Sequence, residues 1–221
     1  MQPKTRTSAE SRFAAIKAFH DRLLELDSVP DYFLCGWSSE QSQRSRFEAL
    51  LRSVRFEGGS VIDYGCGTGR LFEFISRLGY NFTYVGLDMN EDMLSVARKS
   101  HDAEFRRVPA DSTDFAQADY VFASGIFQFR DMHNPTYHIL LTEALFGKAT
   151  RGFAANYLSN LRASSEKQED ELYLTANDLT DLGARLSSRW VLDHSYHPGR
   201  GDMTLGVLKE HTDQSWKRPT F

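Results

Sequence analysis

The chain has 221 residues, a length that fits one domain, or one domain with an appended cap. Hydrophobic residues make up 41% of the chain and charged residues 25%, which argues against an intrinsically disordered or fibrous class. A net charge of -4 argues against a nucleic-acid-binding surface, and two cysteines are too few for a disulfide framework or a four-cysteine zinc site.

The N-terminal region predicts two helices and a cap over residues 1–58. Apolar residues at spacings of three and four between positions 13 and 26 predict one amphipathic helix, which should end before Val29-Pro30. A second helix should begin at Ser38 or Ser39, and its buried stripe should be Phe47, Leu50, Leu51 and Val54. The connector between them contains Trp37, which is either a core anchor or a lid over a ligand.

From residue 59 onward the pattern alternates between strand and helix. Strands are expected at residues 60–64, 82–87, 105–110, 120–127 and 152–158. One intervening helix should end at Gly79, another should begin at Asn90, and a third should begin at Asn134-Pro135. A polar loop over residues 159–171 and a helix over 175–188 should follow.

The last two strands, at residues 190–196 and 203–208, are joined by a short connection that contains Gly and Pro. Such a connection permits only antiparallel pairing, because a parallel return needs about a dozen residues. The predicted fold class is therefore α/β. A seven-stranded, mostly parallel sheet with an antiparallel C-terminal hairpin and helices on both faces should occupy residues 59–221.

The most informative segment is a glycine-rich turn between the first strand and the next helix, Asp63-Tyr64-Gly65-Cys66-Gly67-Thr68-Gly69. A backbone without Cβ atoms can approach a ligand closely. A dinucleotide-binding turn would have its third glycine one residue later, where Arg70 stands. The carboxylate of Asp63 would repel a pyrophosphate but can accept hydrogen bonds from an ammonium group. The turn therefore favours a nucleoside that bears an amino acid.

This turn resembles the first motif of class I S-adenosylmethionine-dependent methyltransferases, which have a Rossmann-like fold. Three later segments resemble the family's next motifs, in the same order: Asp88-Met89, Asp111-Ser112 and residues 118–125. The resemblance covers residues 60–130 and implies S-adenosylmethionine as the cofactor. It also implies that Asp88 binds the ribose hydroxyls and that Asp111 and Ser112 lie beside the adenine.

The residues expected to bind the cofactor lie in these motifs or in the N-terminal segment. They are Trp37, Arg46, Asp63, Gly65, Cys66, Gly67, Gly69, Asp88, Met89, Asp111, Ser112 and Ser124. The N-terminal segment resembles the entry segment of some small bacterial methyltransferases, in which an arginine meets the cofactor's carboxylate. Arg46 is the candidate for this contact, and a solvated helix face is the alternative. His133, just after the fourth strand, is the candidate general base because imidazole titrates near neutral pH; a structural histidine at a helix entry is the alternative.

The sequence therefore predicts methyl transfer to an oxygen or nitrogen atom of a small molecule. The Asn/Asp-Pro-Pro-Tyr/Phe tetrapeptide of DNA amino-methylases is replaced by Ser124-Gly125-Ile126-Phe127, so nucleic acid is not expected as a substrate. We expect no metal and no membrane partner, a cytoplasmic location, and an oligomeric state that stays open, a homodimer included. Two alternatives remain: a non-catalytic module that binds the cofactor or its product, and a nicotinamide-dependent oxidoreductase.

Overall fold

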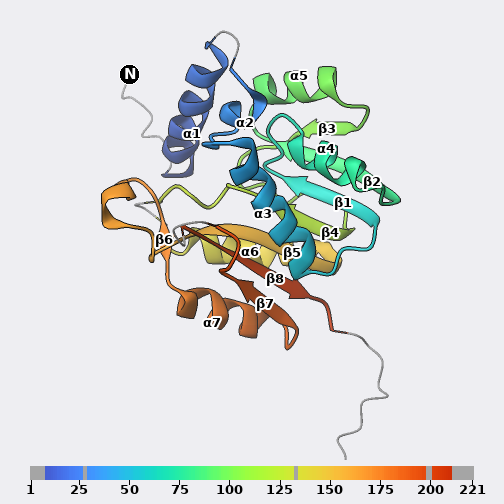
Figure 1. Ribbon diagram of the computed structural model, residues 1–221, viewed down its shortest axis with the longest axis vertical. Coiled ribbons are helices and arrows are strands. Elements are labelled where there is room, and N and C mark those ends of the chain that lie inside the picture. The colour runs from blue at the N-terminus through green and yellow to red at the C-terminus, as the bar shows by residue number, and fades with distance from the viewer. Residues whose placement is uncertain (1–7, 27–28, 132–133, 198–200, 211–221) are drawn as a thin grey trace, which may run out of the picture.

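The computed structural model describes residues 8–26, 29–131, 134–197 and 201–210 (Figure 1). Its sheet has the order β3-β2-β1-β4-β5-β8-β7. The first five strands in sequence are parallel: β1 (Gly59–Tyr64), β2 (Phe82–Asp88), β3 (Glu104–Arg107), β4 (Ala118–Ala123) and β5 (Ala149–Ser159). β8 (Asp202–Leu208) is antiparallel to β5, and β7 (Trp190–Asp193) is antiparallel to β8. The predicted α/β class, parallel sheet and antiparallel hairpin are confirmed.

One short strand was not predicted. β6 (Tyr173–Leu174) pairs in parallel with the end of β5, outside the seven-strand path. Just before it, a short 3-10 helix (Ser164–Glu166) interrupts the predicted polar loop. The main chain of the following residues pairs with the segment after β4. Arg130 N donates to Asp170 O over 2.7 Å, and Leu172 N donates to Gln128 O over 2.8 Å.

Helices cover both faces of the sheet, as predicted. The helices α3 (Glu40–Ser53), α4 (Arg70–Arg77) and α5 (Glu91–Ser100) pack on one face, and α6 (Tyr137–Lys148) and α7 (Ala176–Leu186) pack on the other. Neighbouring residues of β1 point to opposite faces: Val61 packs with α3, α4 and α5, and Ile62 packs with α6 and α7. Burial on both faces explains why the adjacent residues Val61 and Ile62 are both apolar.

The helix starts follow local hydrogen-bonding chemistry. Ser39 caps α3 by accepting from Ser42 N, and Asn90 caps α5 by accepting from Asp92 N. The predicted start of α6 at Asn134-Pro135 is wrong. Tyr137 N donates to Asn134 O, so these residues form a turn and the helix begins at Tyr137.

The N-terminal helices lie beside the carboxyl ends of the parallel strands. α1 (Ser8–Leu24) ends five residues before the predicted Val29, and a single-turn helix, α2 (Asp31–Leu34), occupies the predicted connector. Both lie near the turn that links β1 to α4 (Figure 1). Ligands of open parallel sheets bind at this edge.

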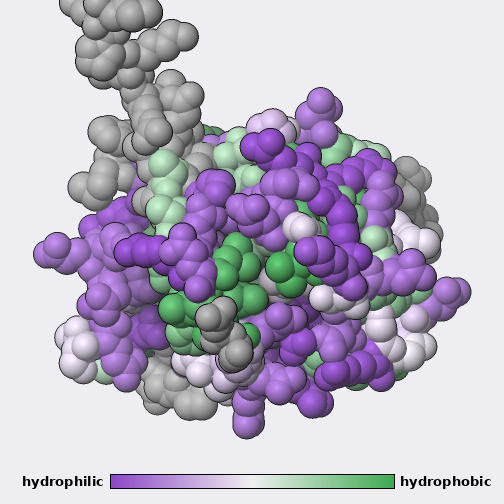
Figure 2. All heavy atoms as spheres, turned by 90° about the horizontal axis from the view of Figure 1, so that it is seen from above, coloured by the Kyte–Doolittle hydropathy of each residue, from purple (hydrophilic) through white to green (hydrophobic). Residues whose placement is uncertain are grey.

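Figure 2 shows the molecule from above the view of Figure 1. This face is mostly hydrophilic, with apolar residues gathered near its middle. Among the residues that the structure describes, no helix is long and apolar enough to cross a bilayer. The same residues contain no group of three His, Cys, Asp or Glu side chains arranged to hold a metal ion.

Candidate active site

The turn between β1 and α4 is held in place by the end of β2. The backbone N–H groups of Gly65 and Cys66 both donate to Leu87 O, over 2.7 and 3.0 Å. Gly65 and Gly67 have φ values of +77° and +54°, which residues with a Cβ rarely adopt. A Cβ at Gly65 would lie only 2.3 Å from the side chain of Ile126. The turn thus requires glycine for its backbone shape and for the close approach of its neighbours.

Asp88, the last residue of β2, accepts two backbone hydrogen bonds. Gly67 N donates to its Oδ2 over 2.8 Å, and Asn90 N donates to its Oδ1 over 2.9 Å. Burial raises the pKa of this carboxyl, and the two N–H groups oppose that rise. Each carboxylate oxygen can accept a further hydrogen bond. The side chain is therefore fixed in position with acceptor capacity left for a ligand.

Asp63, near the end of β1, is almost completely buried, with 3% of its surface exposed. Its Oδ2 accepts a hydrogen bond from the Tyr84 hydroxyl over 2.6 Å. Burial raises the pKa of the carboxyl to about 7, although the Tyr84 bond favours the charged form. The nearby charge of Asp88 adds to the rise. A cationic group beside Asp63 would relieve both effects.

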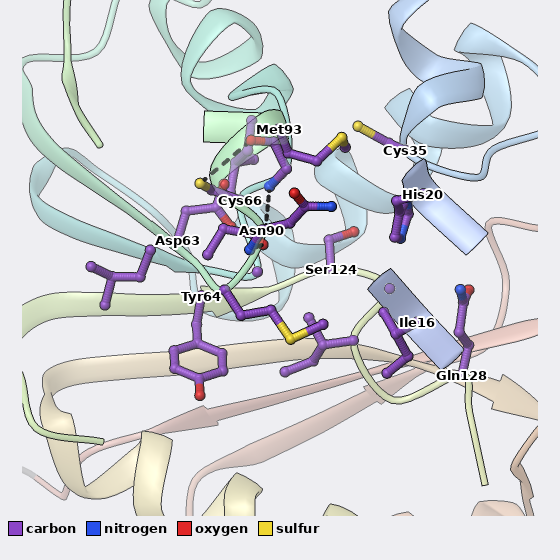
Figure 3. A pocket seen from close by; sticks show the side chains of 18 of the residues that line it. Ile16, His20, Cys35, Asp63, Tyr64, Cys66, Asn90, Met93, Ser124 and Gln128 are labelled. Carbon is purple, nitrogen blue, oxygen red and sulfur yellow. Dashed lines mark hydrogen bonds between the residues drawn. The ribbon is translucent and has the colours of Figure 1, made fainter. Parts of the chain in front are cut away.

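A single cavity joins these groups. It has a volume of about 1070 Å³, including space open to solvent, and it extends from the strand ends to α1. In the view of Figure 3, Asp63 and Tyr64 lie on one side of the cavity, and Ile16 and His20 lie on the other. The predicted site residues that line this cavity are Trp37, Asp63, Gly65, Cys66, Gly67, Asp88, Met89, Asp111 and Ser124.

Two predicted residues, Gly69 and Ser112, lie near the cavity without lining it. Gly69 is the N-cap of α4 at φ +83°, and a Cβ there would meet Phe105 on the far side of the turn. Ser112 contributes its backbone oxygen, which accepts a hydrogen bond from the Tyr64 hydroxyl over 3.2 Å. Both residues support the shape of the wall. His133 lies outside the described residues.

Arg46, the candidate for the cofactor's carboxylate, does not line the cavity. Its guanidinium is buried in an ion pair with Asp202 of β8, and it donates to Ser42 O over 2.6 Å. The guanidinium also lies over the Trp37 ring, 4.3 Å from the centroid. The two groups pair because a buried charge that has lost its hydration is costly unless an opposite charge compensates it.

Trp37 packs against the chain at the tip of β4 and also lines the cavity. Its ring packs on Gly125, at the tip of β4, so closely that a Cβ at Gly125 would lie 2.9 Å from it. The same ring lines the cavity and is backed by Arg46. Trp37 is therefore both a packing anchor and part of the cavity wall.

Sequence analysis missed the contribution of α1. Ile16 and His20 both line the cavity, and His20 Nδ1 is 2.9 Å from the backbone oxygen of Leu34. The spacing of four between Ile16 and His20 could have indicated that both residues lie on one face of the helix. Gln128 and Phe129, just after the strand predicted at residues 120–127, also line the cavity.

The chain is similar to methyltransferases in three comparisons. The methyltransferase domain family matches residues 61–145. The Mycobacterium tuberculosis protein Rv1506c, which is named as a methyltransferase, is 33% identical over 159 residues, covering 68% of this chain and 93% of that protein. The fatty-acid O-methyltransferase of Mycolicibacterium smegmatis is 32% identical over 112 residues, covering 48% of this chain and 40% of the relative.

Solved structures agree with the fold. The magnesium protoporphyrin IX methyltransferase of Synechocystis PCC 6803, crystallised with S-adenosylmethionine, matches with a TM-score of 0.61 at 14% identity, covering 95% of this chain and all of the other. The plantazolicin methyltransferase BpumL, in complex with a substrate analogue and S-adenosylhomocysteine, matches with a TM-score of 0.60 at 17% identity, covering 92% and 95%. At these identities the likeness concerns the fold alone.

Proposed function

Because this chain belongs to the class I S-adenosylmethionine-dependent methyltransferases, with S-adenosylmethionine as its cofactor, we propose that it methylates a small-molecule acceptor at an oxygen or nitrogen atom. The observation that carries this proposal is the single cavity that extends from the glycine turn to the side chains of α1. A cavity lined by a helix on the side away from the turn suits a small acceptor better than a polymer. The net charge of -4 and the missing tetrapeptide after β4 disfavour nucleic acid as the acceptor.

The residues of the glycine turn fit this cofactor. A Cβ at Gly67 would lie 3.2 Å from Cys35 Sγ and 3.3 Å from Met93 Cε, so only glycine leaves the backbone open to a ligand here. In our proposal the carboxylate of Asp88 accepts hydrogen bonds from the ribose hydroxyls, with both of its oxygens already oriented by backbone N–H groups. Met89 and Asp111 flank the adenine, since both line the cavity at the ends of β2 and β3.

Asp63 suits the amino-acid end of the cofactor. An ammonium group beside this buried carboxyl would stabilise its ionised form and so offset the rise of its pKa. A pyrophosphate at the same place would add negative charge beside Asp63 and Asp88. This difference disfavours a nicotinamide-dependent oxidoreductase.

The bound cofactor supplies an electrophilic methyl group on a sulfonium sulfur. The chain's own residues hold the acceptor in line with that group and keep water away, which can lower the barrier by several kcal/mol. Trp37 and the α1 side chains close the cavity on the acceptor side. Ser124, at the tip of β4, donates its hydroxyl hydrogen to Asn156 Oδ1 over 2.8 Å and so presents an acceptor oxygen to the cavity.

A thermal shift titration with S-adenosylhomocysteine, run beside NAD at equal concentration, tests the proposal. A ligand at 100 times its dissociation constant should add about 2.7 kcal/mol to the free energy of unfolding. We expect stabilisation by S-adenosylhomocysteine and none by NAD. Stabilisation by NAD alone, or by neither compound, would contradict the assignment of the turn. A screen of small acceptors for methyl incorporation then separates an enzyme with turnover from a module that only binds.

A further inference from the structure

Charge is distributed unevenly over the cavity wall. Among the described lining residues, the formally charged side chains are Asp63, Asp88, Asp111 and Arg70, and all four lie at the carboxyl ends of β1 and β2 or in the segments that follow β1 and β3. The wall between α1 and the segment after β4 is formed by Ile16, His20, Ser124, Gly125, Ile126, Gln128, Phe129 and Tyr137. We call this second wall the acceptor wall. Its described residues include no Asp, Glu, Lys or Arg.

His20 is the imidazole of the acceptor wall. Because a carbonyl oxygen can only accept, the 2.9 Å contact with Leu34 O makes Nδ1 the protonated nitrogen. In the neutral ring Nε2 then carries a lone pair. Figure 3 shows His20 beside the cavity, on the same helix as Ile16. The backbone of α2 therefore selects the tautomer whose Nε2 can act as a base.

Two carboxylates interact electrostatically with His20: Asp21 on α1 and Asp88 at the end of β2. The ring also packs edge-on against Phe19, which in turn contacts Phe129 of the acceptor wall, with centroids 5.1 and 6.1 Å apart. These contacts hold the imidazole at the boundary between the two halves of the cavity.

We propose that His20 is the general base of the reaction and that the acceptor is an uncharged, largely apolar molecule whose reacting group is a hydroxyl. This role rests on the methyl transfer proposed above. The acceptor's O–H bond breaks and its proton passes to His20 Nε2. The oxygen forms a bond to the methyl carbon while the bond between that carbon and the sulfonium sulfur breaks, and its electron pair remains on sulfur.

The class of acceptor follows from the cost of burial. A carboxylate or an ammonium group placed against the acceptor wall would lose its hydration without a charged partner among the described wall residues. An aromatic or aliphatic body would instead replace water against Ile16, Ile126 and Phe129. A neutral hydroxyl needs only one hydrogen-bond acceptor, which His20 supplies.

The first experiment separates this role from cofactor binding. Binding of S-adenosylhomocysteine is measured by calorimetry for the natural protein, His20→Gln, His20→Ala and the control His194→Gln, a residue that does not line the cavity. We expect the same dissociation constant in all four. If the natural protein does not bind, the proposed function itself fails. If only the His20 variants lose binding, His20 serves the cofactor and this inference is wrong.

The second experiment uses matched acceptors on naphthalene and decane scaffolds, each bearing a hydroxyl, a carboxylate or an aminomethyl group. We expect the hydroxyl compounds alone to stabilise the protein saturated with S-adenosylhomocysteine, and to be methylated when S-adenosylmethionine is present. His20→Ala should lower kcat about 100- to 10,000-fold, and added imidazole should restore part of it. His194→Gln should keep full activity.

Three results would overturn the inference: preference for the carboxylate or aminomethyl compounds, no response to any hydroxyl compound in a protein that binds S-adenosylhomocysteine, and equal activity of natural and His20 variants on the hydroxyl compounds.

Discussion

The half of the cavity at the ends of β1, β2 and β3 differs from the acceptor wall in what holds it together. Backbone hydrogen bonds fix the first half: Leu87 O receives the N–H groups of Gly65 and Cys66, and Asp88 receives that of Gly67. The acceptor wall is joined to α1 and to Trp37 by side-chain contacts, namely the Phe19–Phe129 ring pair and the packing of Trp37 on Gly125, and it has main-chain hydrogen bonds only to the loop after β5 among the contacts described above. Side chains can change without breaking a sheet, so this wall is free to adapt to an acceptor while the first half serves a constant cofactor.

The largest effect is expected from a side chain added in the glycine turn, in the half of the cavity that backbone hydrogen bonds fix. Gly67→Val places a branched side chain where Cys35 and Met93 already lie, so it should abolish measurable binding of S-adenosylhomocysteine by calorimetry. Gly79→Val is the matched control. Gly79 also has a positive φ, +75°, but a Cβ there meets nothing within 4 Å. The control should lose about 1–3 kcal/mol of stability and keep its affinity. Binding by Gly67→Val would show that the turn is not the site.

The next effect concerns the buried ion pair behind Trp37. Arg46→Met leaves the carboxylate of Asp202 buried without its partner, and should lower the free energy of unfolding by about 3–5 kcal/mol in urea titrations. The double variant Arg46→Met, Asp202→Leu should recover most of that loss, because no charge then remains buried. Cofactor affinity should change little in the double variant. A large loss of cofactor affinity without a loss of stability would instead indicate that Arg46 binds the cofactor's carboxylate.

A smaller effect is expected at Asp88. Asp88→Ala removes a charged acceptor and should weaken binding of S-adenosylhomocysteine by about 1.5–3 kcal/mol. Asp119→Ala is the control at the opposite end of the sheet, where that carboxylate accepts from Ser60 N over 2.9 Å. The control should cost stability without altering affinity. Unchanged affinity in Asp88→Ala would contradict the ribose assignment.

The smallest effect is a pH dependence set by Asp63. With its pKa raised to about 7, the carboxyl is mostly protonated at pH 6 and mostly ionised at pH 8. An ammonium ligand needs the ionised form, so affinity for S-adenosylhomocysteine should rise about tenfold between these pH values. Asp63→Asn should give a flat profile. A dependence that persists in this variant would assign the titration to another group.

The raised pKa of Asp63 has the opposite effect on the stability of the protein without its cofactor. Asp63 has a higher pKa in the folded chain than its ordinary value of 3.8, so the folded state binds this proton more tightly than the unfolded state does. The resulting stabilisation is fully present below about pH 4 and is lost as the pH rises through 7. The free protein should therefore lose part of its stability over the range in which it gains cofactor affinity, and urea titrations of Asp63→Asn should lack this loss.

The part of the molecule that could be predicted from sequence is the part set by backbone chemistry. The glycine turn and the strands buried on both faces can be recognised in the sequence, so the sequence places Asp63, Gly67 and Asp88 at the strand ends, where they line the cavity. The ion pair of Arg46 could not be predicted, because a sequence does not reveal that Asp202, 156 positions later, packs against it. The place of His20 on the cavity wall could not be predicted either, because it depends on how α1 packs against α2, where Nδ1 of His20 meets Leu34 O.

The main-chain pairing of residues 128–130 with residues 170–172 has an evolutionary consequence. A surface loop usually tolerates insertions because nothing depends on its conformation. Here the loop after β5 is tied to the acceptor wall by bonds that do not depend on side-chain identity. Lengthening or shortening residues 160–169 can therefore move Gln128 and Phe129 while the sheet and the cofactor half stay intact. Acceptor preference in relatives of this chain can diverge through loop length, and libraries that vary that length are the natural starting point for changing what the enzyme methylates.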